Sequence, residues 1–280
     1  MQPVMRRAII IAIVLLVASV GYTQKKGDEL VQIFAKDLKP AEELLPAGFK
    51  VEKDFQPGVD REVGIVEYSE GEAFIIHLGA KTAYLAKPNL PLSQGDTLVT
   101  QENARIQARL EDKSTIALAP LSKIILDKVF WDQRTQQRDT VANLVIGKAR
   151  FVAQRVEGAR PEDYKVVTPT ATVGIRGSDF AVAVAPRSAI SEKISLLGLT
   201  STAFAAGPAL GTVVLTGART TVGFSGSVGG AQTVGPYSAS YAPEGGAAGS
   251  PLGVTPTLAH QILGHVGPRL AVMAMPPEFD

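Results

Sequence analysis

The chain has 280 residues, of which 45% are apolar and 20% are charged, and its formal net charge is +1. This composition is typical of a globular protein with a sizeable core rather than of a disordered chain. The near-zero charge gives no electrostatic basis for nucleic-acid binding. The absence of cysteine excludes disulfides, zinc-ribbon sites and thiol catalysis.

The N-terminal segment has the layout of an export signal. Arg6-Arg7 precede the uninterrupted apolar run Ala8–Val20, and small residues follow up to Gly21. As a helix the run would cover only about 20 Å of a hydrocarbon core of roughly 30 Å. We interpret residues 1–23 as a signal peptide cleaved near Gly21 or as an uncleaved inner-membrane anchor, with a buried soluble helix as a third interpretation. Either of the first two places the rest of the chain in the periplasm.

Residues 24–59 are predicted to form a helical spacer. Asp28 can cap a helix over Glu29–Leu38, whose apolar residues share one face, and Pro40 ends it. One interpretation is a spacer that packs on the following domain or holds it away from the membrane. The other is a docking helix for a partner.

From Glu62 onward the apolar residues change to the period of β-strands. The alternation is complete in residues 104–110, where Ile106 and Leu110 are expected to face the core. Arg105 and Arg109 are expected to face water.

The strands that this pattern predicts are short and closely spaced. A hairpin turned at Ser69-Glu70-Gly71 is expected first, and Phe130–Asn143 is expected to be an exposed polar hairpin anchored by Trp131. The fold class that this favours is all-β, an antiparallel β-sandwich or short β-roll. The other predicted strands are Thr97–Thr100, Thr115–Leu118, Lys123–Asp127, Leu144–Ile146, Arg150–Gln154, Tyr164–Thr168, Phe180–Val184, Thr212–Thr216, Thr220–Phe224, Gln232–Gly235 and Ser238–Tyr241.

The last third of the chain is richer in glycine and poorer in charge. Pro186–Leu210 is an insertion, interpreted either as a lid packed on the sandwich or as an exposed apolar surface. Pro243–Pro256 has the composition of a linker, and Thr257 can cap a helix over Leu258–Val266.

The stretch Tyr164–Val184 contains the most distinctive residues. Pro169 restricts the backbone, while Gly174 and Gly177 permit positive φ or close approach of another strand. Arg176 lies between them, and a guanidinium among apolar strands needs a carboxylate or carbonyl partner, such as Asp179.

This stretch resembles the signature of FecR-type periplasmic domains, Thr-Pro-x-Ala followed by Val-Gly-Val-Arg-Gly-Thr-x-Phe. Here it reads Thr168-Pro169-Thr170-Ala171 and Val173-Gly174-Ile175-Arg176-Gly177-Ser178-Asp179-Phe180, with Ser178 in place of threonine. Four segments that precede the signature also agree with the family and come in its order: Val63–Val66, Leu92–Thr100, Ala104–Leu126 and Leu144–Phe151. The resemblance covers residues 60–243, which it defines as a FecR-type β domain, and leaves 244–280 as a linker and short C-terminal helix or tail.

The resemblance also implies which residues form the family signature. These residues are expected to be structural rather than catalytic, although Arg176 could instead contact an anionic ligand. They are Thr168, Pro169, Gly174, Arg176, Gly177, Ser178, Phe180, Gly95 and Asp96.

In relatives that regulate iron transport, an N-terminal anti-sigma region precedes the membrane span. Only residues 1–7 precede the apolar run here, so the expectation is a stand-alone domain without that region. The resemblance then implies an exported, non-catalytic module for binding, signalling or scaffolding in the bacterial cell envelope. The alternatives are a structural component of an envelope or secretion assembly and, less favoured, a periplasmic enzyme.

No catalytic or cofactor motif stands out. His260 and His265 are spaced for different helix faces, and the pairs Glu42-Glu43 and Glu111-Asp112 are expected to be exposed. The sequence therefore predicts no catalytic, metal or cofactor site, no enzyme activity and no nucleic-acid partner. The expected partner is an envelope protein or a glycan.

Overall fold

The computed structural model describes residues 23–36, 38, 44–45, 48–175, 177–186, 188–190 and 210–267. The apolar run Ala8–Val20, Arg176 and most of the Pro186–Leu210 insertion lie outside these residues. The fold is mostly β, with 49% strand and 13% helix, which confirms the predicted all-β class. Among the described residues, no helix has the length and apolar character needed to cross a membrane.

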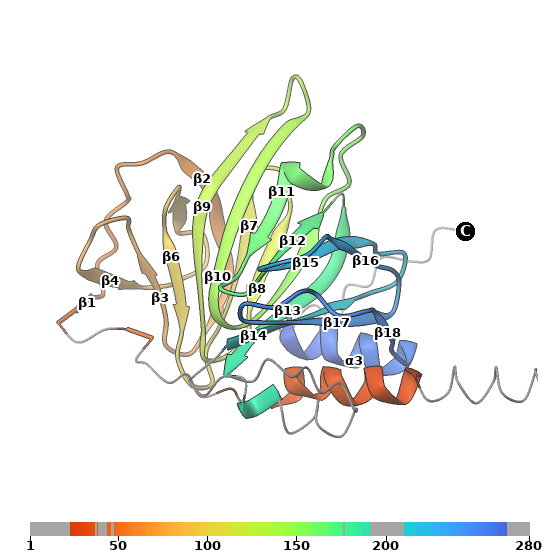
Figure 1. The fold of residues 1–280 in the computed structure, drawn as a ribbon. Helices are drawn as coiled ribbons and strands as arrows, with labels where there is room; N and C mark the ends of the chain where they lie inside the picture. The colour runs from red at the N-terminus through yellow and green to blue at the C-terminus, as the bar shows by residue number, and fades with distance from the viewer. Residues whose placement is uncertain are drawn as a thin grey trace, which may run out of the picture.

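The strands form two sheets that share one long strand, β10 (Gln137–Ala153) (Figure 1). The ladders are antiparallel except for β1 with β4 and β10 with β11. Sheet A runs in the order β1 (Lys50–Glu52), β4 (Thr82–Leu85), β3 (Ala73–Ile76), β6 (Thr97–Thr100), β9 (Ser122–Asp132), the first half of β10, β11 (Tyr164–Val167), β12 (Ala171–Ile175), β15 (Val222–Gly226) and β16 (Gln232–Val234).

Sheet B contains the second half of β10 and the strands on both sides of it. Its order is β5 (Pro91–Ser93), β2 (Glu62–Glu70), β7 (Arg105–Leu110), β8 (Thr115–Leu118), β10, β13 (Ser178–Pro186), β14 (Leu210–Thr216), β17 (Ser238–Pro243) and β18 (Leu252–Gly253).

The main core lies between the two sheets, as a sandwich requires. Val66, Ile106 and Leu118 of sheet B and Leu98 and Ile124 of sheet A belong to one buried cluster. Ile106 and Leu110 are 1% and 3% exposed, which confirms the inward register predicted for that strand.

Gly147 is the corner at which β10 passes from sheet A to sheet B. The sequence suggested two separate strands here, but the strand is continuous, with φ +91° at Gly147. A Cβ atom at this position would clash with Leu121 and Ser122. Glycine lets the backbone bend sharply against its neighbour.

The predicted hairpin at Ser69-Glu70-Gly71 is wrong. β2 pairs with β5 and β7 in sheet B, whereas β3 pairs with β4 and β6 in sheet A. Gly71, with φ +68°, therefore begins an arch between the sheets rather than a turn within one. The residue types at the turn do not distinguish an arch from a hairpin, because the chain reverses its direction sharply in both.

Two helices cover the outer face of sheet B. Residues 23–31 are helical and continue into η1 (Gln32–Ala35), and α3 is Pro256–Val266. Figure 1 shows them side by side along β13, β14 and β17. They bury the outward residues of those strands in a second core, which includes Ala181, Ala183, Ala185, Val213, Leu215, Leu30, Phe34, Ile262 and Leu263.

The helix caps differ from the predicted ones. Asp28 lies inside the N-terminal helix, and its carboxylate accepts hydrogen bonds of 2.6 Å from both the backbone N–H and the hydroxyl of Thr255. Thr255, not Thr257, is the N-cap residue of α3, and Pro256 opens the helix. The carboxylate of one helix therefore fixes the start of the other.

Three further expectations of exposure are wrong. Arg105 is 7% exposed and Asp112 6%. The segment Phe130–Asn143 is not uniformly exposed, because Arg138 and Thr140 face the core. Val129, 2% exposed, is more deeply buried in this hairpin than Trp131, which is half-buried.

Candidate functional site

The turn between β11 and β12 contains the first part of the signature. The Thr168 hydroxyl accepts a 2.9 Å hydrogen bond from the Ala171 N–H, and the Thr168 N–H donates to the Ala171 carbonyl at 2.9 Å. Pro169 is exposed at the tip. Threonine and proline thus close a tight turn by bonding the backbone locally.

The same turn ties the two sheets together. The Thr212 hydroxyl on β14 lies 2.7 Å from that of Thr168 and 2.6 Å from that of Thr170. The Thr170 hydroxyl also donates to the Ala242 carbonyl on β17 at 3.1 Å. All three threonines are buried, so this network is a structural link within the core.

Gly177 forms the second corner between the sheets, from β12 to β13. Its φ is +135°, and a Cβ atom there would lie 2.7 Å from the Arg155 Cα atom. Both facts require glycine.

The remaining signature residues around this corner lie in strands. Gly174 on β12 pairs with Lys165 and Gly223. The Ser178 hydroxyl donates to the Thr221 carbonyl at 3.4 Å. Phe180 is fully buried and stacks on Phe151 with ring centroids 5.1 Å apart. Arg176 lies outside the described residues.

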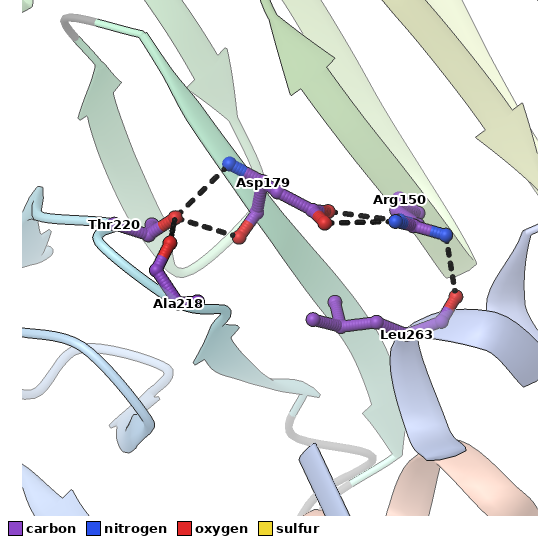
Figure 2. Close-up of polar contacts among 5 residues, drawn as sticks. All are labelled: Arg150, Asp179, Ala218, Thr220 and Leu263. Carbon is purple, nitrogen blue, oxygen red and sulfur yellow. Dashed lines mark hydrogen bonds and ion pairs between the residues drawn. The ribbon is translucent and has the colours of Figure 1, made fainter. Parts of the chain in front are cut away.

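Asp179 pairs with an arginine from a different strand, as Figure 2 shows. Arg150 Nε and Nη2 donate to the two carboxylate oxygens of Asp179 at 2.8 Å and 2.7 Å. Arg150 Nη1 donates to the carbonyl of Leu263 in α3 at 3.2 Å. The Asp179 N–H donates to the Thr220 hydroxyl at 3.1 Å. The Asp179 carboxylate therefore orients Arg150 toward the last turn of α3.

Three basic residues on the outer face of sheet B cap the ends of both helices. Arg105 Nη1 donates to the carbonyls of His265 and Gly267 at 2.7 Å and 3.2 Å. Lys148 Nζ donates to the carbonyls of Phe34 and Lys36 at 3.2 Å and 2.6 Å. With Arg150, these cations supply donors to carbonyls that a helix end leaves unpaired, and they complement the negative end of its dipole.

Sequence reasoning missed this set of cations. The alternation correctly put Arg105 on the face opposite the sandwich core, but it assumed that this face met water. The available signal was the alternation of Lys148 and Arg150 on one strand, next to a strand whose outward residues after Asp179 are all alanine: Ala181, Ala183 and Ala185. An apolar outward face on a neighbouring strand indicates a covering layer.

Gly95 and Asp96 form a turn that holds a histidine. Gly95 has φ +84°, and Asp96 Oδ2 accepts a 2.7 Å hydrogen bond from the Ser93 N–H. Asp96 Oδ1 lies 2.7 Å from His77 Nδ1, and His77 Nε2 lies 2.7 Å from the Gln56 carbonyl oxygen. Burial, the largest effect, raises the pKa of Asp96 against the lowering effect of these hydrogen bonds.

The two contacts of His77 require two hydrogens. A carbonyl oxygen only accepts hydrogen bonds, so Nε2 carries one hydrogen. The short contact between Nδ1 and Asp96 needs a second hydrogen, either on Nδ1 or on the carboxyl group. The pair can therefore exchange a proton.

The signature residues that the structure describes lie at three separate places. They occupy the β11–β12 turn, the Gly177 corner and the separate Gly95 turn. Within the described ranges, no group of three or more histidine, cysteine, aspartate or glutamate side chains is arranged to hold a metal ion. What the arrangement does is fix two sheets and two helices relative to one another.

Comparison with known proteins identifies one family. Residues 96–193, about a third of the chain, match the family described as FecR protein, which confirms the resemblance over that segment. Two crystal structures of a "putative anti-sigma factor from Parabacteroides distasonis ATCC 8503" are similar at 14% identity, with TM-scores of 0.35 and 0.34. Each similarity covers 52% of this chain and 53% of that chain, so the chain spans about half the length of those structures. No curated protein matches the chain.

Proposed function

Because residues 96–193 match the FecR protein family, we propose that this protein is a non-catalytic module for binding, signalling or scaffolding in the bacterial cell envelope. FecR proteins are regulatory rather than enzymatic, which supports a signalling role. Arg6-Arg7 and the apolar run Ala8–Val20 support export, with the segment either cleaved or kept as an inner-membrane anchor. The proposed partner is an envelope protein or a glycan.

One observation carries the non-catalytic part of this proposal. The polar side chains of the signature that the structure describes all form bonds inside the fold: Thr168 and Thr170 with Thr212, and Asp179 with Arg150. Their donors and acceptors are used by strands and helix ends. Catalysis needs such groups to be directed at a substrate, whereas a binding module needs a rigid framework for its surface.

Export is tested with an alkaline phosphatase fusion after Asp60. The enzyme folds to an active form only outside the cytoplasm, so the fusion is expected to be active in intact cells. An intact but inactive fusion in the cytosol would contradict the proposal. N-terminal sequencing of the mature chain then distinguishes cleavage near Gly21 from an uncleaved anchor.

Partner binding is tested by site-specific photocrosslinking in living cells. The crosslinker replaces one of four exposed apolar residues on different parts of the surface: Val51, Leu78, Phe130 or Val228, which are 52%, 68%, 40% and 54% exposed. A specific partner gives a defined adduct from some positions and none from the others. A constant stoichiometry after purification would favour a structural component of an assembly. Turnover of an envelope glycan by the purified protein would contradict a non-catalytic module.

A further inference from the structure

A charged and polar group of side chains lies inside the sandwich, at the end covered by the β10–β11 connection. Arg138 and Thr140 alternate on β10, so they face the same side, and Thr140 lies opposite Tyr164 on β11. The Arg138 guanidinium carbon lies 5.0 Å from the centre of the Tyr164 ring. The side chain of Arg138 is 0% exposed, Thr140 is 1% exposed and Tyr164 is 0% exposed.

Among the described residues, only Nη1 of the Arg138 guanidinium has hydrogen-bond partners. Nη1 donates to Asp112 Oδ2 at 3.3 Å and to the Gln154 carbonyl at 2.8 Å. Arg138 Nε, Arg138 Nη2, the Thr140 hydroxyl and the Tyr164 hydroxyl have no hydrogen-bond partner among the described residues. Buried polar groups are almost always satisfied, by protein or by ordered water.

We propose that ordered internal water binds between Arg138, Thr140 and Tyr164 and completes their hydrogen bonding. Water supplies both kinds of missing partner, an acceptor for the guanidinium N–H groups and an acceptor or donor for the two hydroxyls. Internal waters typically make about three such bonds, which these four atoms provide.

Charge favours water over a small anion at this site. Asp112 already neutralises Arg138, and its own oxygens accept from the Ser114 N–H at 2.9 Å and the Ser114 hydroxyl at 2.8 Å. A second anion would be buried beside Asp112 without a second cation, which is costly. A neutral ligand that accepts hydrogen bonds avoids that repulsion.

A crystal structure of the full chain tests the proposal directly. We expect a water oxygen within hydrogen-bond distance of Arg138 Nε or Nη2 and of at least one of the two hydroxyls. A dry site in well-ordered density would overturn the proposal, and so would density for an oxoanion.

A double-mutant cycle tests it in solution. The Thr140 and Tyr164 hydroxyls have no hydrogen-bond partner among the residues that the structure describes. Without shared water, Thr140→Val and Tyr164→Phe should therefore each raise Tm or leave it unchanged, and their effects should add. With shared water we expect each change to lower Tm and the double variant to fall by less than the sum. Additive shifts, or a raised Tm for Tyr164→Phe, would overturn the proposal.

Two controls complete the test. Thr140→Ser keeps the hydroxyl and should retain the coupling to Tyr164→Phe. Melts in sodium chloride and in sodium phosphate at equal ionic strength separate water from an anion. A saturable rise of Tm with phosphate that Tyr164→Phe removes would overturn the assignment to water.

Discussion

At the scale of single residues, Gly177 shows why a signature position tolerates one residue type. Its φ of +135° is unfavourable for any side chain, and a Cβ atom would lie within 2.7 Å of the Arg155 backbone. We therefore expect Gly177→Val to lower the free energy of unfolding by at least about 1–3 kcal/mol, measured by urea denaturation. Gly235→Ala is the matched control, because no atom lies within 4 Å of its Cβ position. Equal midpoints for the two variants would contradict this account.

Asp96 gives a prediction about pH. Its pKa is raised, mainly by burial, from the ordinary value of 3.8, so the folded state holds its proton more tightly than the unfolded state. The protonated Asp96 carboxyl therefore contributes to the stability of the folded state. This contribution is complete below pH 3.8 and is lost as the pH rises through the folded-state pKa of Asp96. Asp163 is affected in the opposite direction, because hydrogen bonds from Arg160, chiefly from its backbone N–H, lower the Asp163 pKa.

Asp96→Asn should remove this part of the pH dependence. The amide can donate to His77 Nδ1 and accept from the Ser93 N–H, as the protonated carboxyl does. We expect the stability of the variant, followed by denaturation between pH 3 and pH 8, to decline less than that of the wild type as the pH rises. A steeper decline in the variant would show that the carboxylate form is the stabilising one. Asp163→Asn, the control, should instead remove stability that is present above pH 3.8.

At the scale of elements, the cations on sheet B decide how α3 is held. Arg105 donates to carbonyls of the last turn of α3 and of the residue that follows it, whereas Arg109, on the same face of the same strand, has a side chain that is 48% exposed. We expect Arg105→Ala to cost about 1–3 kcal/mol, because the carbonyls lose their donor in a buried setting. Arg109→Ala should stay within about 0.5 kcal/mol. Denaturant titration of both variants checks the contrast, and equal effects would show that the cap contributes nothing.

The strands themselves could be predicted because their apolar alternation is local. Thr97–Thr100 and Thr115–Leu118 were predicted with their observed ends, and the register of residues 104–110 was correct toward the core. What the pattern of residues 104–110 alone could not predict was that a helix covers the outer face of sheet B. Burial of Arg105 depends on residues near position 265, more than 150 positions away, and the pattern of its own strand contains no information about them.

The candidate site shows the same limit. The sequence identified Pro169 as a position that restricts the backbone and Gly177 as a position that permits positive φ, since both properties are local. The partner of Asp179 was not identified, because Arg150 comes from another strand and is selected by pairing of β10 with β13. The arch at Gly71 was missed for the same reason, since sheet membership is a long-range property.

At the scale of the whole molecule, the segment that matches the FecR family is not a structural unit by itself. Residues 96–193 contain β6 to β13, but β6 pairs with β3, β7 pairs with β2 and β13 pairs with β14, all outside the segment. The helices that cover sheet B also lie outside it. The excised segment would expose the outer face of β13, whose Ala181, Ala183 and Ala185 are fully buried in the whole chain.

We therefore expect a fragment of residues 96–193 not to fold cooperatively, whereas residues 23–267 should fold. Loss of the second core alone removes the apolar partners of Ala181, Ala183 and Ala185, and burial of each apolar side chain contributes on the order of 1 kcal/mol or more. A fragment of residues 23–254, which lacks α3, should be intermediate: it keeps both sheets but leaves Arg105 and Arg150 without the helix carbonyls. Thermal melts followed by circular dichroism, together with binding of a dye for exposed apolar surface, rank the three fragments. A sharp melt of residues 96–193 at the temperature of residues 23–267 would show that the flanking strands and helices are accessory.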